Sequence, residues 1–227
     1  MEWTKQYKKA VTFSYDDGET QDQRFVNLLN QYGIKCTFNI NTSLGNETGS
    51  FPVGHIIVKR YPIEELVPIY QGHEVASHTL THPFLTQIPR KEIIKEIKGD
   101  LANIETVFKQ KAVGFAYPYG YYNDEIVSIL DELGVRYART CEINHQFKIQ
   151  TDLLRFRPTC HHLDPKLFAL IDEFLNSNTD EPQLFYLFGH SYEFDVDNNW
   201  ELIEEICQRL GNHSDIYYGT NKEVFGV

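Results

Sequence analysis

The stretch TFSYDDG, residues 12–18, places two adjacent aspartates, Asp16 and Asp17, directly after a run of strand-forming residues. Neighbouring carboxylates repel each other, and each disfavours ionisation of the other, so the pair needs a compensating positive partner. A metal ion is the most effective such partner. The stretch therefore predicts a strand whose carboxyl end carries a candidate metal site, with further ligands supplied from elsewhere in the chain.

Strand-like and helix-like runs alternate on either side of this stretch. Strands are predicted at residues 10–15, 35–40, 73–77, 112–117, 135–139, 154–159, 184–189 and 215–219. Helices are predicted at residues 22–32, 63–70, 90–109, 123–133, 165–176 and 198–210. Several of these helices end just before a glycine, the usual helix stop. The alternation predicts an α/β fold with a parallel sheet. Its length fits a distorted (β/α) barrel of about seven parallel strands, with chemistry at the strands' carboxyl ends.

The length and composition predict one globular domain, residues 1–227. The chain is 41% hydrophobic and 14% aromatic, which is enough apolar material for a sizeable core. Residues 41–60 break the alternation of strands and helices and begin with a polar, glycine-rich sequence. We interpret them as an insertion or a long loop over one rim of the barrel.

The charge and the cysteines exclude several classes of protein. The net charge of −11 argues against nucleic acid and anionic membrane surfaces as partners, because both need a basic face. Four scattered cysteines without CxxC spacing predict buried free thiols rather than a disulfide framework. The sequence contains no signal-peptide core and no run of roughly 18–20 apolar residues, so we expect a cytoplasmic protein.

The stretch SHTLTHP, residues 77–83, supplies candidate ligands for the ion. His78 and His82 are four residues apart, so on a helical turn their imidazoles would lie on one face. They follow the predicted strand 73–77 and therefore share the sheet edge with Asp17. Two neutral imidazoles and one carboxylate form a three-ligand set with positions open to water, the pattern typical of catalytic zinc.

Two further stretches also follow predicted strands. FAYPYG, residues 115–120, contains a turn that can direct the backbone N–H of Tyr119 towards a developing oxyanion. In YLFGHSYEFD, residues 186–195, an apolar strand leads into His190, whose ordinary pKa range suits a general acid. Glu193 and Asp195 follow closely, and either is a candidate to orient that imidazole.

In this order, the four stretches resemble the polysaccharide deacetylase family, the NodB-homology domains of carbohydrate esterase family four. The resemblance spans about residues 10–190. It implies a distorted (β/α) barrel that removes the N-acetyl group from an N-acetylated sugar or oligosaccharide. It also implies that Asp17, His78 and His82 hold a divalent ion, which we expect to be zinc.

The same resemblance implies three catalytic roles. Asp16 would be the base, the Tyr119 N–H would contact the oxyanion, and His190 would protonate the leaving amine. One position departs from the family pattern, which usually has an arginine in the third motif to brace the catalytic aspartate. That position is Ala116 in this chain.

The missing guanidinium has two candidate replacements, Arg139 and Arg157, which lie in the predicted strands 135–139 and 154–159. The sequence does not choose between them. Tyr121 and His161 are further candidates for substrate contact, because aromatic faces stack on sugar rings and His161 follows a predicted strand.

Two alternatives to sugar deacetylation stay open at this point. Ala116 and the expected cytoplasmic location favour an acylated small molecule, as in a metal-dependent hydrolase of a non-sugar amide or cyclic imide. A catalytically inactive barrel that binds carbohydrate is the alternative outside the enzymes. The paired aspartates, the two histidines and His190 weigh against it, because a binding module needs neither a base nor an acid.

Overall fold

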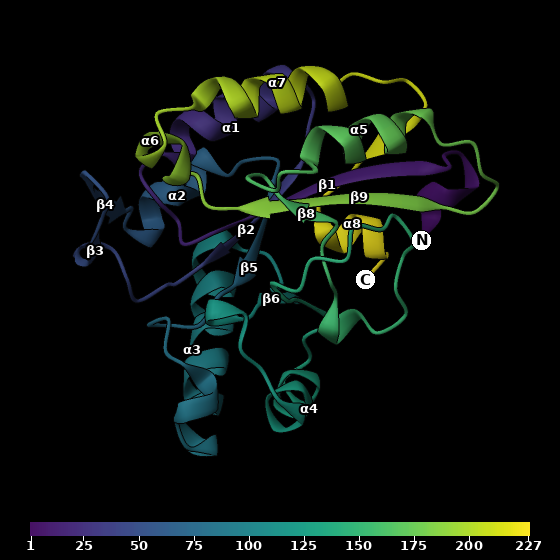
Figure 1. Ribbon diagram of the computed structural model, residues 1–227. Helices are drawn as coiled ribbons and strands as arrows, with labels where there is room; N and C mark the ends of the chain where they lie inside the picture. The colour runs from purple at the N-terminus through teal and green to yellow at the C-terminus, as the bar shows by residue number, and fades with distance from the viewer.

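This computed structural model describes the backbone of residues 1–227 and the side chains of all residues except Asn46 and Glu47. Its centre is a parallel sheet of strand order β7-β6-β5-β2-β1-β9-β8, and β10 pairs with the first half of β1 (Figure 1). The strands are β1 (Lys9–Asp16), β2 (Cys36–Ile40), β5 (Glu74–Ser77), β6 (Gly114–Ala116), β7 (Tyr137–Arg139), β8 (Cys160–His161), β9 (Gln183–Gly189) and β10 (Ile216–Tyr218).

All six predicted helices form, with ends within about two residues of the prediction. The helices are α1 (Asp22–Gln31), α2 (Ile63–Ile69), α3 (Arg90–Phe108), α4 (Asp124–Glu132), α5 (Leu167–Asn176), α6 (Glu193–Val196), α7 (Trp200–Leu210) and α8 (Asn221–Phe225). The short helices α6 and α8 were not predicted. Amphipathic spacing explains the longer ones, since α7 buries Ile203, Ile206 and Leu210 against the core. No described helix is long and apolar enough to cross a membrane.

The predicted strand at 154–159 is wrong as a regular strand. A 3-10 turn covers Leu153–Arg155, after which Phe156 forms a single parallel bridge with Arg139. Pro158 has no N–H to donate, which disfavours a continuous ladder here. The chain then reaches β8, which pairs with β9. Residues 156–161 therefore link β7 to β9, and the sheet curls into the predicted distorted barrel.

Residues 41–60, interpreted from the sequence as an insertion or a long loop, largely form a β-hairpin. Strand β3 (Asn46–Val53) pairs antiparallel with β4 (Ile56–Arg60), and in Figure 1 the hairpin projects beyond α2. Two backbone hydrogen bonds dock β4 on the turn after β1, Thr20 N–H to Lys59 O and Tyr61 N–H to Gly18 O, both 2.9 Å. The hairpin thus becomes a wall beside the end of β1.

The parallel sheet brings the carboxyl ends of β1, β5, β6 and β9 to one edge. Its strands are buried on both faces because helices cover them, as in other parallel sheets. The four stretches singled out in the sequence follow these four strand ends. They therefore meet at one edge of the sheet, although Asp16 and His190 are 174 positions apart in the sequence.

Candidate active site

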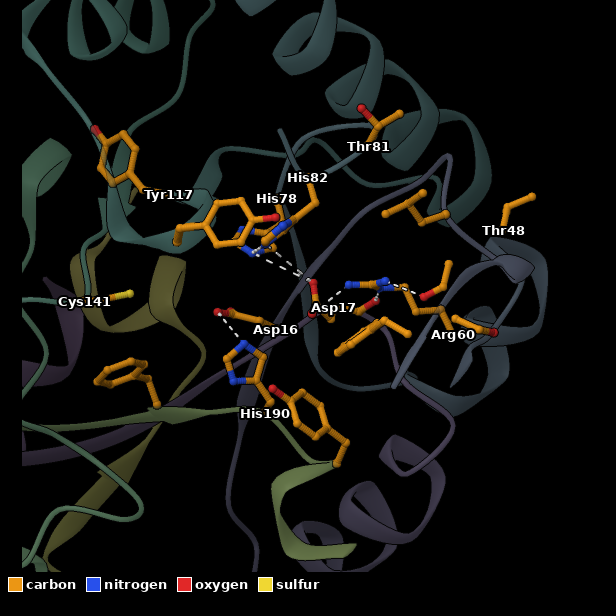
Figure 2. A pocket seen from close by; sticks show the side chains of 17 residues that line it. Asp16, Asp17, Thr48, Arg60, His78, Thr81, His82, Tyr117, Cys141 and His190 are labelled. Atoms are coloured by element: carbon orange, nitrogen blue, oxygen red, sulfur yellow. Dashed lines mark hydrogen bonds and ion pairs between the residues drawn. The ribbon is translucent and has the colours of Figure 1, made fainter. Parts of the chain in front are cut away.

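A pocket of about 590 Å³ opens at this edge of the sheet (Figure 2). Its lining includes six predicted site residues: Asp16, Asp17, His78, His82, Tyr119 and His190. Arg139 lies behind the lining and bonds to Asp16. Tyr121, Arg157 and His161 are not part of the lining. Cys141, expected to be buried, is exposed at the pocket wall, whereas the other three free cysteines are buried.

Asp17 and the two histidines form a compact three-ligand set. The Asp17 Oδ1 atom is buried and has no hydrogen-bond partner among the described side chains. It lies 4.0 Å from Nε2 of His78 and 4.0 Å from Nε2 of His82. The two Nε2 atoms are 3.0 Å apart, and Figure 2 shows both imidazoles directed at the Asp17 carboxylate.

The protonation of this set fits a cation. Nδ1 of His78 donates to the Ala116 carbonyl at 2.8 Å, so Nε2 of the neutral ring keeps its lone pair. Burial lowers the pKa of both imidazoles, and the neighbouring His78 helps to lower that of His82 to about 4. The lone pair of His78 Nε2 and the Asp17 carboxylate face the same space, as the ligands of a cation do. Two imidazoles and one carboxylate are ligands that zinc accepts.

The prediction that a helical turn aligns the two histidines is wrong. Residues 78–84 form an irregular loop in which Thr79 and His82 adopt left-handed backbone angles, φ +71° and +56°. The Thr79 hydroxyl accepts the His82 N–H at 3.0 Å, a local bond that competes with helix formation. Asn41 donates to the carbonyls of His78 and Thr79 at 2.5 and 3.1 Å, which fixes the loop. The two imidazoles do lie side by side, but an irregular loop and not a helical turn brings them together.

Arg60 of β4 holds Asp17 from the other side. Its guanidinium pairs with Asp17 Oδ2 at 2.8 Å, and its Nε donates to the Asp17 carbonyl at 3.1 Å. Burial raises the pKa of Asp17, but Arg60 and the nearby histidines outweigh this and lower that pKa to about 2. Arg60 was not predicted as a site residue, because no motif marks it. Its sequence context offers one indication, since it ends the segment 41–60, which interrupts the alternation of strands and helices.

Asp16 is braced by Arg139 and not by Arg157. The Arg139 guanidinium donates to Asp16 Oδ2, and the Asn39 amide donates to Oδ1 at 2.9 Å. Arg139 is buried over the Phe188 ring, whereas the exposed Arg157 pairs with Glu142 at 2.9 Å. Arg139 is also the residue that pairs with Ala116 across β6 and β7. The guanidinium that braces Asp16 therefore comes from β7. The usual third-motif arginine would lie on the neighbouring strand β6, at the position of Ala116.

This arrangement predicts very different costs for two arginine substitutions. Arg139→Met leaves the buried Asp16 carboxylate without its cation, and we expect it to lower the free energy of unfolding by about 3–5 kcal/mol. Arg157→Met removes an exposed ion pair and should cost less than about 1 kcal/mol. Urea unfolding of both variants measures the difference. Equal costs would contradict the assignment of Arg139 as the brace.

His190 follows β9 and faces Asp16. Its Nε2 lies 3.9 Å from Asp16 Oδ2, and its Nδ1 lies 3.6 Å from Glu193 Oε2, which also accepts the His190 N–H at 3.0 Å. Burial lowers the pKa of His190, but the negative charges of Glu193, Asp16 and Asp17 outweigh this and raise it to about 10. Asp195 instead accepts hydrogen bonds from Trp200 and Gln21, both at 2.7 Å. Glu193 is therefore the carboxylate that orients His190.

His161 and His162 surround the same Glu193 carboxylate, each with Nε2 3.2 Å from Oε2. The Leu163 N–H donates to Nδ1 of His161 at 3.1 Å. With His190, His161 and Glu193 form a second group of residues that could hold a metal ion. The structure places His161 against Glu193 and outside the pocket lining.

A buried acidic pair, also missed by the sequence analysis, holds the loop that carries His190. Glu19 accepts the Tyr192 N–H at 2.8 Å, and the Ser191 hydroxyl lies 3.0 Å from Glu19 and 2.7 Å from Asp22. Burial raises the pKa of both carboxyls, that of Asp22 to about 7. From the pattern of residues, Asp22 was expected only to begin the helix at residues 22–32.

Tyr119 lies in the turn after β6 with φ +58°. Its N–H has no hydrogen-bond acceptor among the described residues, so it is free to bind an oxygen in the pocket. Gly120 must follow it, because a Cβ at that position would lie 2.8 Å from Cβ of Cys141. Tyr121 is exposed beyond the turn.

A family model described as polysaccharide deacetylase matches residues 4–138 of the chain. The chain belongs to the polysaccharide deacetylase family. This part includes both aspartates, both histidines and the Tyr119 turn. His190 and Glu193 lie beyond the matched residues, so their assignment depends on the geometry described above.

Among curated proteins, the chain is similar to the chitooligosaccharide deacetylase of Rhizobium leguminosarum bv. trifolii, with 29% identity over 130 residues. That match covers 56% of this chain and 54% of the relative. The chain spans about half or less of the length of the curated relatives that it matches.

Two solved structures share the fold. A family 4 carbohydrate esterase from Streptomyces lividans, in complex with acetate, has a TM-score of 0.61 and 18% identity, with 94% of this chain and 93% of that chain covered. A CE4 family pseudoenzyme from Bacillus anthracis has a TM-score of 0.59 and 17% identity, with 96% and 66% covered. These likenesses identify the CE4 barrel, and the family therefore includes a barrel without activity.

Proposed function

We propose that this polysaccharide deacetylase family member is a metal-dependent hydrolase that removes the N-acetyl group from an N-acetylated sugar or oligosaccharide. The observation that carries the proposal is the buried, unpartnered Asp17 Oδ1 facing two neutral imidazoles. Such an arrangement is costly in a protein that binds no cation. Asp16 and His190 lie in the same pocket, as a base and an acid for the reaction must.

The ligands would be Asp17, His78 and His82, and zinc is the ion we propose. A divalent ion bound there would polarise the acyl carbonyl and lower the pKa of a water molecule. Asp16 accepts a proton from the attacking water while Arg139 and Asn39 hold its carboxylate in one orientation.

Two other groups act on the acyl oxygen and on the nitrogen. The Tyr119 N–H donates to the oxygen that becomes negative as water adds to the acyl carbon. His190 donates a proton to the nitrogen, the C–N bond breaks, and acetate and a free amine leave. Its raised pKa keeps the imidazolium available at neutral pH.

The pocket and the relatives support this substrate class. A volume of about 590 Å³ is within the usual range for a small ligand, which fits one N-acetylated sugar ring. The test offers N-acetylglucosamine oligomers, small acylated amines and a cyclic imide side by side, each with zinc present. Acetate from the oligomers supports the proposal. Turnover of the other substrates alone favours a non-sugar amidase, and sugar binding without turnover favours an inactive barrel, as in the pseudoenzyme relative.

The proposed acid predicts a shift in the pH profile. Glu193→Gln removes the carboxylate charge that raises the pKa of His190, so that pKa falls and the acid form is lost at lower pH. The alkaline limb of kcat/KM should therefore move to lower pH. Asp195→Asn is the matched control, because Asp195 faces Trp200 and Gln21. An unmoved alkaline limb in Glu193→Gln would exclude His190 as the titrating acid.

A further inference from the structure

Three exposed aromatic rings lie together at the rim of the pocket. Phe84, Tyr119 and Tyr121 have 37%, 50% and 58% of their surface exposed. The chain contains 15 phenylalanines, 14 tyrosines and two tryptophans. Among those whose side chains the structure describes, only these three are exposed to this extent. Exposed apolar side chains that lie together in this way are typical of a binding surface.

The rings continue outward from the metal ligands. The His82 ring contacts Tyr119 edge-on, with centroids 4.4 Å apart. Tyr119 stacks on Phe84 at 3.9 Å with an angle of 8° between the planes, and Tyr121 lies 5.9 Å from Phe84. Because Tyr119 itself lines the pocket, the three rings form a surface continuous with the site. We call Phe84, Tyr119 and Tyr121 the aromatic platform.

The platform is held in place by strained backbone. Tyr119 has φ +58°, a left-handed conformation that is unfavourable for a residue with a Cβ. His82, two residues before Phe84, has φ +56°. The loops after β5 and β6 thus present the platform in a fixed position, and such strain is typical of functional sites.

The hairpin lies on the other side of the ligand set. Asp17 lies between the histidines and Arg60, as Figure 2 shows. On the Arg60 side, Phe51 of the hairpin contacts Tyr192, with ring centroids 5.7 Å apart. The pocket is thus bounded on one side by the hairpin and on the other by Tyr119 of the platform.

We propose that the aromatic platform binds the sugar ring next to the one whose acetyl group is removed. The C–H face of a pyranose is apolar and flat, so it stacks on exposed aromatic rings, while its hydroxyls stay in water. The inference rests on the proposed function, and it narrows the substrate to an oligosaccharide of at least two rings. A single N-acetylated sugar in the pocket leaves Phe84 and Tyr121, which lie outside the lining, uncovered.

The kinetic test compares the N-acetylglucosamine monomer with its β-1,4-linked tetramer in zinc-loaded protein. In the native chain we expect kcat/KM to be higher for the tetramer. Phe84→Ala and Tyr121→Ala should each lower the tetramer-to-monomer ratio of kcat/KM by about three- to tenfold, the loss of one ring contact. The matched control is Val67→Ala on α2, a residue 38% exposed, which should leave the ratio unchanged. A ratio unaffected by both platform substitutions overturns the proposal.

A binding measurement separates this proposal from the proposed reaction. Calorimetry of the tetramer on Asp16→Asn protein should give an affinity that Phe84→Ala and Tyr121→Ala weaken by a similar factor. If that affinity depends on the platform but the native protein releases no acetate, the subsite stands and the reaction fails. If acetate is released equally from monomer and tetramer, the reaction stands and the subsite fails.

Discussion

His82→Ala is expected to abolish both metal binding and acetate release. The substitution removes one of the two Nε2 atoms that face Asp17 Oδ1 and leaves a two-ligand site. We expect the affinity for zinc to fall by more than about 100-fold, since even the loss of a residue that only hydrogen-bonds to a ligand costs about 10–100-fold. The protein should remain folded, because the His82 side chain lies at the pocket wall and not in the core. Zinc titration and acetate release are measured on the same preparation.

His55→Ala is the matched control for this prediction. His55 is exposed at the turn of the hairpin, so its removal deletes an imidazole without touching the ligand set. This variant should bind zinc and release acetate like the native chain. Undiminished zinc affinity in His82→Ala would mean that the ion is held elsewhere.

His190→Ala should keep the metal and lose turnover of amides. A positioned general acid contributes about 10²–10⁴-fold, and an amine leaves slowly unless it is protonated. Activity towards an aryl acetate with a good leaving group should fall much less, because a phenolate departs without a proton. The ratio of the two activities isolates the role of His190 from any general damage to the site.

Equal losses on the amide and on the aryl ester would contradict the acid role. They would indicate that His190 instead supports Asp16, which it approaches to 3.9 Å. Zinc affinity is measured alongside, and it should match that of the native chain, because His190 is not among the proposed ligands.

The location of the site could be predicted because it follows from topology. In a parallel sheet every strand's carboxyl end reaches the same edge, so motifs placed after predicted strands had to meet. Asp17, His78 and His190 come from β1, β5 and β9, and the sequence pattern located all three strands. The grouping of Asp17, His78 and His82 could be predicted as well, because imidazoles and carboxylates are common metal ligands.

The contacts between distant segments could not be predicted. The choice of Arg139 over Arg157 depends on the register that pairs Arg139 with Ala116. Arg60 reaches Asp17 through a hairpin without a recognised motif. Spacing alone suggested a helical turn for the histidines, but local bonding by Thr79 favours a loop. In each case a long-range or side-chain interaction decided the geometry, and neither is visible in local periodicity.

Acetate release from N-acetylglucosamine oligomers, before and after zinc is added to metal-stripped protein, tests the central claim most directly. The account predicts no acetate from the stripped protein and recovery of activity that saturates at one zinc ion per chain. Zinc bound at that stoichiometry without any acetate released would contradict the assignment of this chain as an active sugar deacetylase.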